Sequence, residues 1–249
     1  MEHILFVIIC WGIGGFVNGV AGFGAALIAM PLVTTMVPLN LAVPSCTILG
    51  MALSLQMAWT YRKHIDFDKL KYIYIGTIPG AIAGITMMQK LPAHYLKLGM
   101  GIFLLTYAIW GMFFEGRKRA VVHKGWGALA GFCSTAISSS VGMGGPPTIV
   151  YTSLAGWAKD TIKAGIASYF IVSGGLIISL QTYAGIQTKE TLMLFAAAAP
   201  AVMIGARLGV LVSEKIGEFS YRKMLFGMLA MMACMILRSA VTTFLTLSA

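Results

Sequence analysis

Residues 4–33 read ILFVIICWGIGGFVNGVAGFGAALIAMPLV and open a run without formal charge that continues to residue 61. The hydrocarbon core of a bilayer is about 30 Å thick, and a helix needs about 20 residues to cross it. The run is therefore too long for one span. Because the glycine-rich residues 19–24 interrupt its first part, we expect a broken helical hairpin over residues 4–37 and a separate helix over about 40–61.

The composition of the whole chain is typical of a membrane protein. Hydrophobic residues make up 58% and charged residues 10% of the 249 positions, against roughly 45–50% and about 25% in soluble domains. The net charge of +10 comes from basic residues scattered in short groups between apolar blocks, which argues against nucleic acid as a partner. The sequence predicts an all-α polytopic membrane protein, with further helices over about 71–89, 95–114, 162–184, 190–212 and 221–246.

A second long apolar block, residues 125–154, is also interrupted. Its centre reads SSSVGMGGPP, residues 138–147, and two prolines after a glycine pair do not fit a continuous helix. We expect two repeats, residues 1–119 and 120–249, each a broken hairpin followed by three transmembrane helices. The features that recur in the same order are Gly15-Phe16 with Gly131-Phe132, Gly22-Phe23-Gly24 with Gly142-Met143-Gly144, Pro79 with Pro200, and Gly84 with Gly205.

The distribution of basic residues indicates how the broken blocks cross. If each block crosses once, the loops on the two faces hold nine and seven Lys and Arg residues, which is no bias. If each block is a re-entrant hairpin, the count becomes thirteen to three, and the positive-inside rule makes the richer face cytoplasmic. Three spans in each half then invert the repeats in the membrane, with both termini outside. The thirteen are Arg62, Lys63, Lys69, Lys71, Arg117, Lys118, Arg119, Lys124, Lys159, Lys163, Lys215, Arg222 and Lys223, and the three are Lys90, Lys97 and Lys189.

Irregular backbone is tolerated at membrane depth only where it is buried in protein or lines a cavity, so we expect the two interruptions to face each other near the midplane. The N-terminus of a half-helix carries unpaired N–H groups and a partial positive charge, and both favour an anion. Hydroxyl and amide side chains add further donors. The residues predicted to surround a small anionic substrate are Asn18, Gly19, Gly22, Phe23, Gly24, Ser138, Ser139, Ser140, Gly142, Met143, Gly144, Gly145 and Pro146.

These residues also have a simpler explanation. Small residues let membrane helices pack closely, and a polar side chain inside a span can bond to a neighbouring helix or to its own. A long arginine side chain can extend to the basic face instead of contacting substrate. Both explanations stay open for a second set of polar residues, the pathway candidates Thr47, Gln56, Ser168, Gln181 and Arg207.

The positions of the remaining reactive groups argue against an enzyme. All eight carboxylates and all four histidines fall at the boundaries of the apolar blocks. A Ser–His pair, an aspartate dyad or a histidine-rich metal motif therefore cannot assemble inside the membrane. The four cysteines form no CxxC pair, so a zinc site is not indicated. We expect no catalytic residue, no metal and no cofactor.

The opening Gly15-Phe16…Gly22-Phe23-Gly24, its echo Gly131-Phe132…Gly142-Met143-Gly144-Gly145-Pro146-Pro147 and the segment Tyr61-Arg62-Lys63 resemble the TauE/SafE family of sulfite and organosulfonate exporters. The resemblance covers essentially the whole chain. It implies a multi-pass transporter of the cell (inner) membrane that exports a small oxyanion such as sulfite, an organosulfonate or a related small acid. A passive anion channel, a carboxylate importer or exporter, and a membrane protein without transport activity stay open as alternatives, and so does a homodimer.

Overall fold

The computed structural model describes residues 2–92 and 123–215, and in addition residues 95, 98, 101–102, 105–106, 109, 227, 230–231, 233–238 and 241–242. In this part of the chain every regular element is a helix, which confirms the expected all-α class. The helices predicted over about 95–114 and 221–246 lie largely outside the described residues. The elements are α1 (Glu2–Ala21), α2 (Ala25–Val33), α3 (Leu39–Thr60), η1 (Arg62–His64), α4 (Phe67–Lys90), α6 (Lys124–Val141), α7 (Gly145–Leu154), α8 (Lys159–Tyr183) and α9 (Lys189–Ser213).

Four of the described helices are long and apolar enough to cross a membrane: Ile4–Ala21, Leu39–Thr60, Lys159–Tyr183 and Lys189–Ser213. Large apolar side chains also cover outward-facing surfaces, among them Ile9, Ile13, Ile204 and Leu208. In water such a continuous apolar surface would drive association, whereas lipid tails solvate it without cost. The chain is therefore a polytopic membrane protein, as the composition predicts.

Glycine backbone geometry produces the two breaks. Gly22 and Gly24 have φ angles of 86° and 97°, and Gly142 has a φ of 78°. Residues with a Cβ rarely adopt this left-handed conformation, so it ends α1 and α6 at these positions. Pro146 and Pro147 then begin α7, where a missing N–H costs no intrahelical bond. The second helix of each pair, α2 or α7, has only nine or ten residues and is too short to cross a bilayer.

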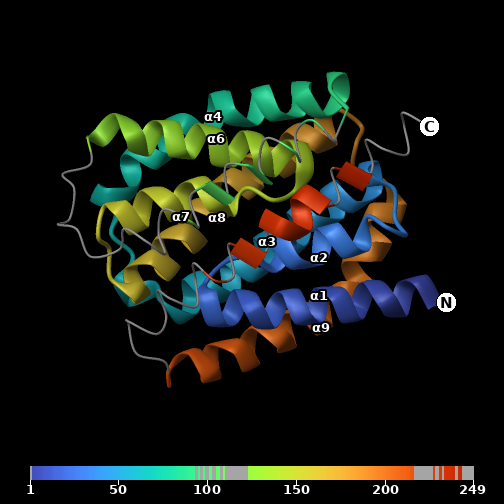
Figure 1. Cartoon of the computed structure of the whole chain (residues 1–249), viewed down its shortest axis with the longest axis horizontal. Coiled ribbons are helices and arrows are strands. Elements are labelled where there is room, and N and C mark those ends of the chain that lie inside the picture. The colour runs from blue at the N-terminus through green and yellow to red at the C-terminus, as the bar shows by residue number, and fades with distance from the viewer. Residues whose placement is uncertain are drawn as a thin grey trace.

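The longer helices pack in three pairs. The pair α4 with α6 and the pair α1 with α9 lie on opposite sides of α3 and α8, which pack on each other (Figure 1). Each outer pair joins a helix from the first half of the chain to one from the second half. The short helices α2 and α7 pack beside α1 and α6 and also contact α3 and α8 respectively.

Small residues let the outer pairs approach until their backbones touch. On α4, a Cβ at Gly76, Gly80 or Gly84 would collide with backbone atoms of α6, and on α9 a Cβ at Gly205 or Gly209 would collide with those of α1. This is the close contact that small residues spaced four apart allow between membrane helices. Since Gly76 meets Ala128, Gly80 meets Phe132 and Gly84 meets Ala136, α4 and α6 run parallel. The same comparison, Gly12 with Ala201 and Gly19 with Ala206, makes α1 parallel to α9.

The central pair runs antiparallel. Lys163, near the start of α8, contacts Tyr61 at the end of α3, while Gln187, just after α8, contacts Pro44 near the start of α3. Lys163 also contacts Gly19 near the end of α1. The helices α1, α3 and α9 therefore run in one direction, and α4, α6 and α8 run in the other.

The turn between α3 and α4 begins the next helix with an acidic cap. The Asp66 carboxylate accepts a hydrogen bond from the Lys69 N–H at 3.3 Å and an ion pair from Lys69 Nζ at 2.9 Å. The hydrogen bonds from Lys69 hold the pKa of Asp66 below its usual value. The cap satisfies one of the N–H groups that the first turn of α4 leaves unpaired.

We predict that Gly76→Leu disrupts the α4–α6 contact. A side chain at this position would meet Ala128 O and the backbone of Phe132, so the two helices would have to separate. Overpacking of this kind costs about 1–3 kcal/mol or more, and thermal unfolding in detergent should show a lower midpoint. Gly175→Leu is the control, because a Cβ at Gly175 meets nothing within 4 Å. Equal midpoints for the two variants would contradict the predicted role of Gly76.

Candidate functional site

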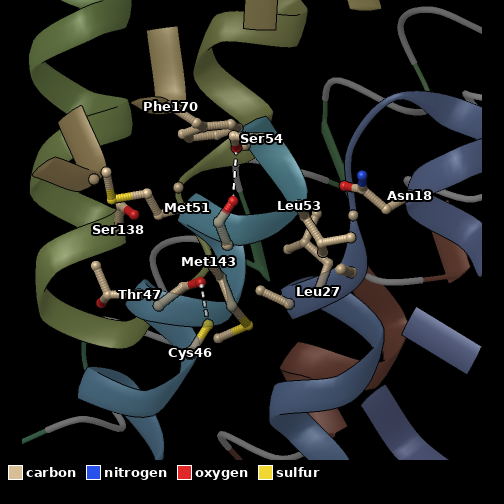
Figure 2. A pocket seen from close by; sticks show the side chains of 18 of the residues that line it. Asn18, Leu27, Cys46, Thr47, Met51, Leu53, Ser54, Ser138, Met143 and Phe170 are labelled. Carbon is tan, nitrogen blue, oxygen red and sulfur yellow. Dashed lines mark hydrogen bonds between the residues drawn. The ribbon is translucent and has the colours of Figure 1, made fainter. Parts of the chain in front are cut away.

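A cavity of about 80 Å³ lies between the two breaks in the helices (Figure 2). A single buried water needs about 10–15 Å³ of such space, so the cavity has room for a small ligand. In the first half of the chain its lining is Trp11, Asn18, Gly24, Ala25, Ala26, Leu27, Cys46, Thr47, Gly50, Met51, Leu53 and Ser54. In the second half it is Ser138, Gly142, Met143, Gly144, Gly145, Phe170, Ser173 and Gly174.

The cavity lies at the middle of the bundle along the direction of the helices. Its lining on α3 runs from Cys46 to Ser54, around the centre of the helix Leu39–Thr60. Its lining on α8 runs from Phe170 to Gly174, around the centre of the helix Lys159–Tyr183. Both central helices therefore extend by similar lengths on either side of the cavity.

The lining residues recur at a fixed spacing along the chain. Ser138 follows Asn18 by 120 positions, and the same spacing separates Gly24 from Gly144 and Leu53 from Ser173. Twelve of the twenty lining residues thus form six pairs at this spacing, and the two members of several pairs differ in chemistry. The full set of pairs is 18 with 138, 24 with 144, 25 with 145, 50 with 170, 53 with 173 and 54 with 174.

Two helix N-termini meet at the cavity. Gly24 is the N-cap of α2, and Ala25, Ala26 and Leu27 form its first turn, whose N–H groups have no partner within the helix. Gly144 is the N-cap of α7, and Gly145 is its first residue. Both cap residues are glycine, so neither helix has a side-chain cap. Pro146 and Pro147 have no N–H, so the free donors come chiefly from α2, whose positive end suits an anionic ligand.

The side chains on the wall differ in whether their donors are already used. Thr47 Oγ1 donates to Val43 O at 2.9 Å and Ser54 Oγ to Gly50 O at 2.7 Å, so both bond to their own helix. Asn18 and Ser138 come from opposite sides of the cavity in Figure 2. Among the described residues nothing accepts a hydrogen bond from either side chain, which leaves the amide and the hydroxyl for a ligand.

About half of the residues predicted to surround a substrate line this cavity. They are Asn18, Gly24, Ser138, Gly142, Met143, Gly144 and Gly145, and the pathway candidate Thr47 joins them. Phe23 lies directly behind them, because a Cβ at Gly145 would be 3.6 Å from Phe23 Cδ2. The structure therefore brings the two predicted interruptions together.

The other predicted residues have packing contacts away from the lining. A Cβ at Gly19 would collide with Ala206 O on α9, and Pro146 is buried in the first turn of α7. The hydroxyls of Ser139 and Ser140 donate to Thr135 O and Ala136 O of their own helix, each at 2.8 Å. Hydroxyls that bond to the preceding turn are the alternative that the sequence leaves open.

The remaining pathway candidates also lie outside the cavity lining. Gln56 donates to Met203 O at 3.3 Å, and Gln181 accepts from Gln187 at 3.0 Å. Ser168 shares a hydrogen bond of 2.9 Å with Tyr74. Arg207 has an exposed side chain on α9. The first three join neighbouring segments of the bundle.

Lys163 is a functional candidate that sequence reasoning assigns to a loop. Its side chain is 0% exposed, and its ammonium donates to Gly19 O at 3.4 Å, to Tyr61 Oη at 3.3 Å and to Ser213 Oγ. The stem of the side chain fills the space beside Gly22, where a Cβ would lie 2.5 Å from Lys163 Cγ. One cation therefore joins the ends of α1, α3 and α9 to the start of α8.

The Lys163 ammonium lies beside the C-terminal ends of helices, which carry unpaired carbonyl groups. Carbonyl groups in the last turn of α1 and α9 have no partner within their helices, and the C-terminal end of a helix carries a partial negative charge. Lys163 meets the end of α1, and the neighbouring Lys159 donates to Ser213 O at 2.6 Å at the end of α9. From the sequence the two lysines only mark a charged boundary. The signal that could have separated them is that Lys163 is one turn further into the following apolar helix.

A multi-span helical protein with a small-ligand cavity between broken helices belongs structurally with membrane transporters. A comparison with family models matches residues 7–236 to the sulfite exporter TauE/SafE family, so the chain belongs to this family. It is a family of transporters, with small anions as the implied substrates. No curated protein and no solved structure matches the chain.

We predict that Lys163→Met destabilises the protein. The substitution keeps the apolar stem beside Gly22 but leaves Gly19 O and Ser213 Oγ without their donor, and an unsatisfied buried polar group costs about 1–3 kcal/mol. The unfolding midpoint in detergent should fall. Lys63→Met removes an exposed lysine and is the control. An unchanged midpoint for Lys163→Met would show that the buried cation contributes nothing to holding these helix ends.

Proposed function

We propose that the protein exports a small oxyanion, such as sulfite or an organosulfonate, through a midplane site between two broken hairpins. The observation that carries the proposal is the meeting of the N-termini of α2 and α7 at one cavity. The first turn of α2 and the Gly145 N–H of α7 supply neutral donors and a positive potential where an anion would otherwise have to enter an apolar bundle. The position of the cavity at the centres of α3 and α8 supports a site at mid-depth.

The directions of the helices support two re-entrant hairpins. Because α1 and α3 run in the same direction, the chain between them has to return along α2 to the face where α1 began. The same holds for α6 and α8, with α7 between them. In this arrangement each hairpin returns to the face of the membrane from which it entered, the first to the outer face and the second to the cytoplasmic face, and the N-terminus lies outside.

The basic residues support the orientation. At the end of the bundle where α3 and α9 finish, the described chain holds eight Lys and Arg positions, and at the other end it holds two. The positive-inside rule makes the first end cytoplasmic. The eight are Arg62, Lys63, Lys69, Lys71, Lys124, Lys159, Lys163 and Lys215, and the two are Lys90 and Lys189.

Inverted repeats over residues 1–119 and 120–249 are supported by the same contacts. The first helix of each half packs on the last described long helix of the other, as α1 on α9 and α6 on α4. The second helices, α3 and α8, pack on each other antiparallel, and the cavity lining recurs at a spacing of 120. A two-fold axis in the membrane plane, through the α3–α8 contact, accounts for all three observations.

Electrostatics favours export over import. A cell interior at −100 mV favours outward movement of each negative charge by about 2.3 kcal/mol. The basic residues at the cytoplasmic end would raise the local concentration of anions at the entrance. A potential-driven uniporter therefore needs no coupling ion to export a monoanion.

We predict saturable, protein-dependent flux of sulfite or methanesulfonate into proteoliposomes, driven by an imposed potential that is positive inside the vesicle. Ser138→Ala should raise KM by at least about tenfold, because a hydrogen bond to a charged group is worth about 1.5–3 kcal/mol. Ser179→Ala is the control, since its hydroxyl bonds to Gly175 O of its own helix and lies outside the cavity. Radiolabelled anion trapped in the vesicles gives the rate.

Two results would contradict this reading of the site. Flux that rises linearly with concentration and shows no exchange of internal for external anion would indicate a passive channel. Equal KM values for Ser138→Ala and the wild type, with normal protein levels, would remove the cavity hydroxyl from the pathway.

We predict that a reporter fused after Ala249 is active when it needs the outside compartment and silent when it needs the cytoplasm. The re-entrant topology puts the C-terminus outside, whereas eight full crossings with a cytoplasmic N-terminus put it inside. A second fusion in the loop at Lys63 should give the opposite result. A C-terminal fusion that is active only in the cytoplasm would overturn the re-entrant topology.

A further inference from the structure

We propose that the cavity selects singly charged oxyanions, such as hydrogen sulfite or a sulfonate, against doubly charged ones, namely the fully deprotonated sulfite dianion and sulfate. The inference rests on the proposed function, since it specifies the charge of the anion that the same site would bind.

The polar groups that line the cavity are neutral. No described lining residue is Lys, Arg, His, Asp or Glu. The available donors are the Asn18 amide, the hydroxyls of Ser138 and Ser173 and the first-turn N–H groups of α2, while Trp11, Leu53 and Phe170 make other parts of the wall apolar. An anion in this cavity would exchange water for a few neutral dipoles.

Neutral donors favour one charge over two. The cost of removing an ion from water grows with the square of its charge, whereas its attraction to fixed dipoles grows only in proportion to the charge. A dianion would therefore meet about four times the desolvation cost for about twice the stabilisation. The two helix N-termini together present at most about one positive charge, because Pro146 and Pro147 remove two N–H groups from the start of α7, so a monoanion is the better match.

Ser173 gives independent evidence for a ligand. Its side chain is 1% exposed and lines the cavity, and its Oγ is a buried polar atom without a hydrogen-bond partner in the described part of the chain. The Tyr169 hydroxyl, which shares a hydrogen bond with Thr135 and donates to Gly131 O at 2.9 Å, lies close to Ser173 but with a geometry too poor for a full hydrogen bond. Buried hydroxyls nearly always have a partner, and a bound oxyanion would supply one.

The titratable groups closest to the cavity are engaged elsewhere. The Lys163 ammonium contacts Gly19, Tyr61 and Ser213 behind the first break and does not line the cavity. The Cys46 thiol, which does line it, donates to Gly142 O at 3.4 Å. Lys159, Asp160 and Glu214 lie near Lys163 at the helix ends. Because these groups can give transport its own pH dependence, the test includes an anion that does not titrate.

The experiment compares sulfite, methanesulfonate and sulfate in proteoliposomes of the wild-type protein, with subsaturating total anion and a fixed potential, from neutral to mildly alkaline pH. Hydrogen sulfite loses its proton in this range, while methanesulfonate stays a monoanion and sulfate a dianion. We expect the sulfite rate to fall about tenfold per pH unit once the monoanion is the minor form. The methanesulfonate rate should stay constant, and sulfate should be transported at least tenfold more slowly.

The outcomes separate the two proposals. A sulfite rate that stays constant or rises with pH, a parallel fall of sulfite and methanesulfonate, or sulfate transport as fast as methanesulfonate would each overturn charge selection while leaving anion transport standing. If no anion shows protein-dependent flux, the proposed function fails and this inference fails with it.

A gain of function tests the same idea from the opposite direction. Met51 lies on the cavity wall, and Met51→Lys replaces one long flexible side chain by another that carries a charge. We expect sulfate transport to appear and the alkaline fall of sulfite transport to weaken. Met51→Gln changes polarity without adding charge and should keep the wild-type selectivity. Sulfate transport in both variants, or a wild-type preference in a folded Met51→Lys protein, would contradict the role of charge.

Discussion

The structure depends on one constraint: backbone N–H and C=O groups inside a hydrocarbon layer must find partners within the protein. Continuous helices meet it automatically, but α1 and α6 stop at glycines inside the bundle. Each stop leaves a set of unpaired carbonyls on one side and a set of unpaired N–H groups on the other. The packing of the remaining helices places both breaks against α3 and α8 at the centre, where these groups are shielded from lipid.

The carbonyl side and the N–H side of the first break have different partners. The last turn of α1 meets the Lys163 ammonium, which satisfies Gly19 O and offsets the negative end of the helix. The first turn of α2 faces the cavity. The Lys163 ammonium thus lies at the C-terminal end of α1, which would repel an anion. The unpaired N–H groups of α2 lie at the cavity, where they would attract one. The second break uses neutral donors instead, with Cys46 on Gly142 O and Ser134 on Gly144 O.

The sequence predicts the helical class, the membrane setting, the family and eight of the twenty residues that line the cavity. Most of these follow from strong local signals, namely the length of the runs without charge and the interruptions by glycine and proline. The lining residues follow because the two breaks have to be buried together. The sequence does not predict in which direction each side chain points. Ser138, Ser139 and Ser140 are consecutive, yet on a helix they point about 100° apart, so the first lines the cavity while the other two bond backward. The burial of Lys163 is not predicted for a related reason, since burial at the end of a helix depends on contacts with segments far away in the chain.

Cys46, Met51 and Phe170 were missed because apolar helix centres carry no local sign of a cavity. The spacing of 120 residues pairs Phe170 with Gly50, but positions 166 and 171, which correspond to Cys46 and Met51, do not line the cavity. The same spacing shows where the two halves differ. Asn18 corresponds to Ser138, Gly50 to Phe170 and Leu53 to Ser173, so equivalent backbone positions carry unequal chemistry. In the proposed inverted repeat, two helix N-termini would converge on one ligand, and the unequal side chains make the wall partly polar and partly apolar.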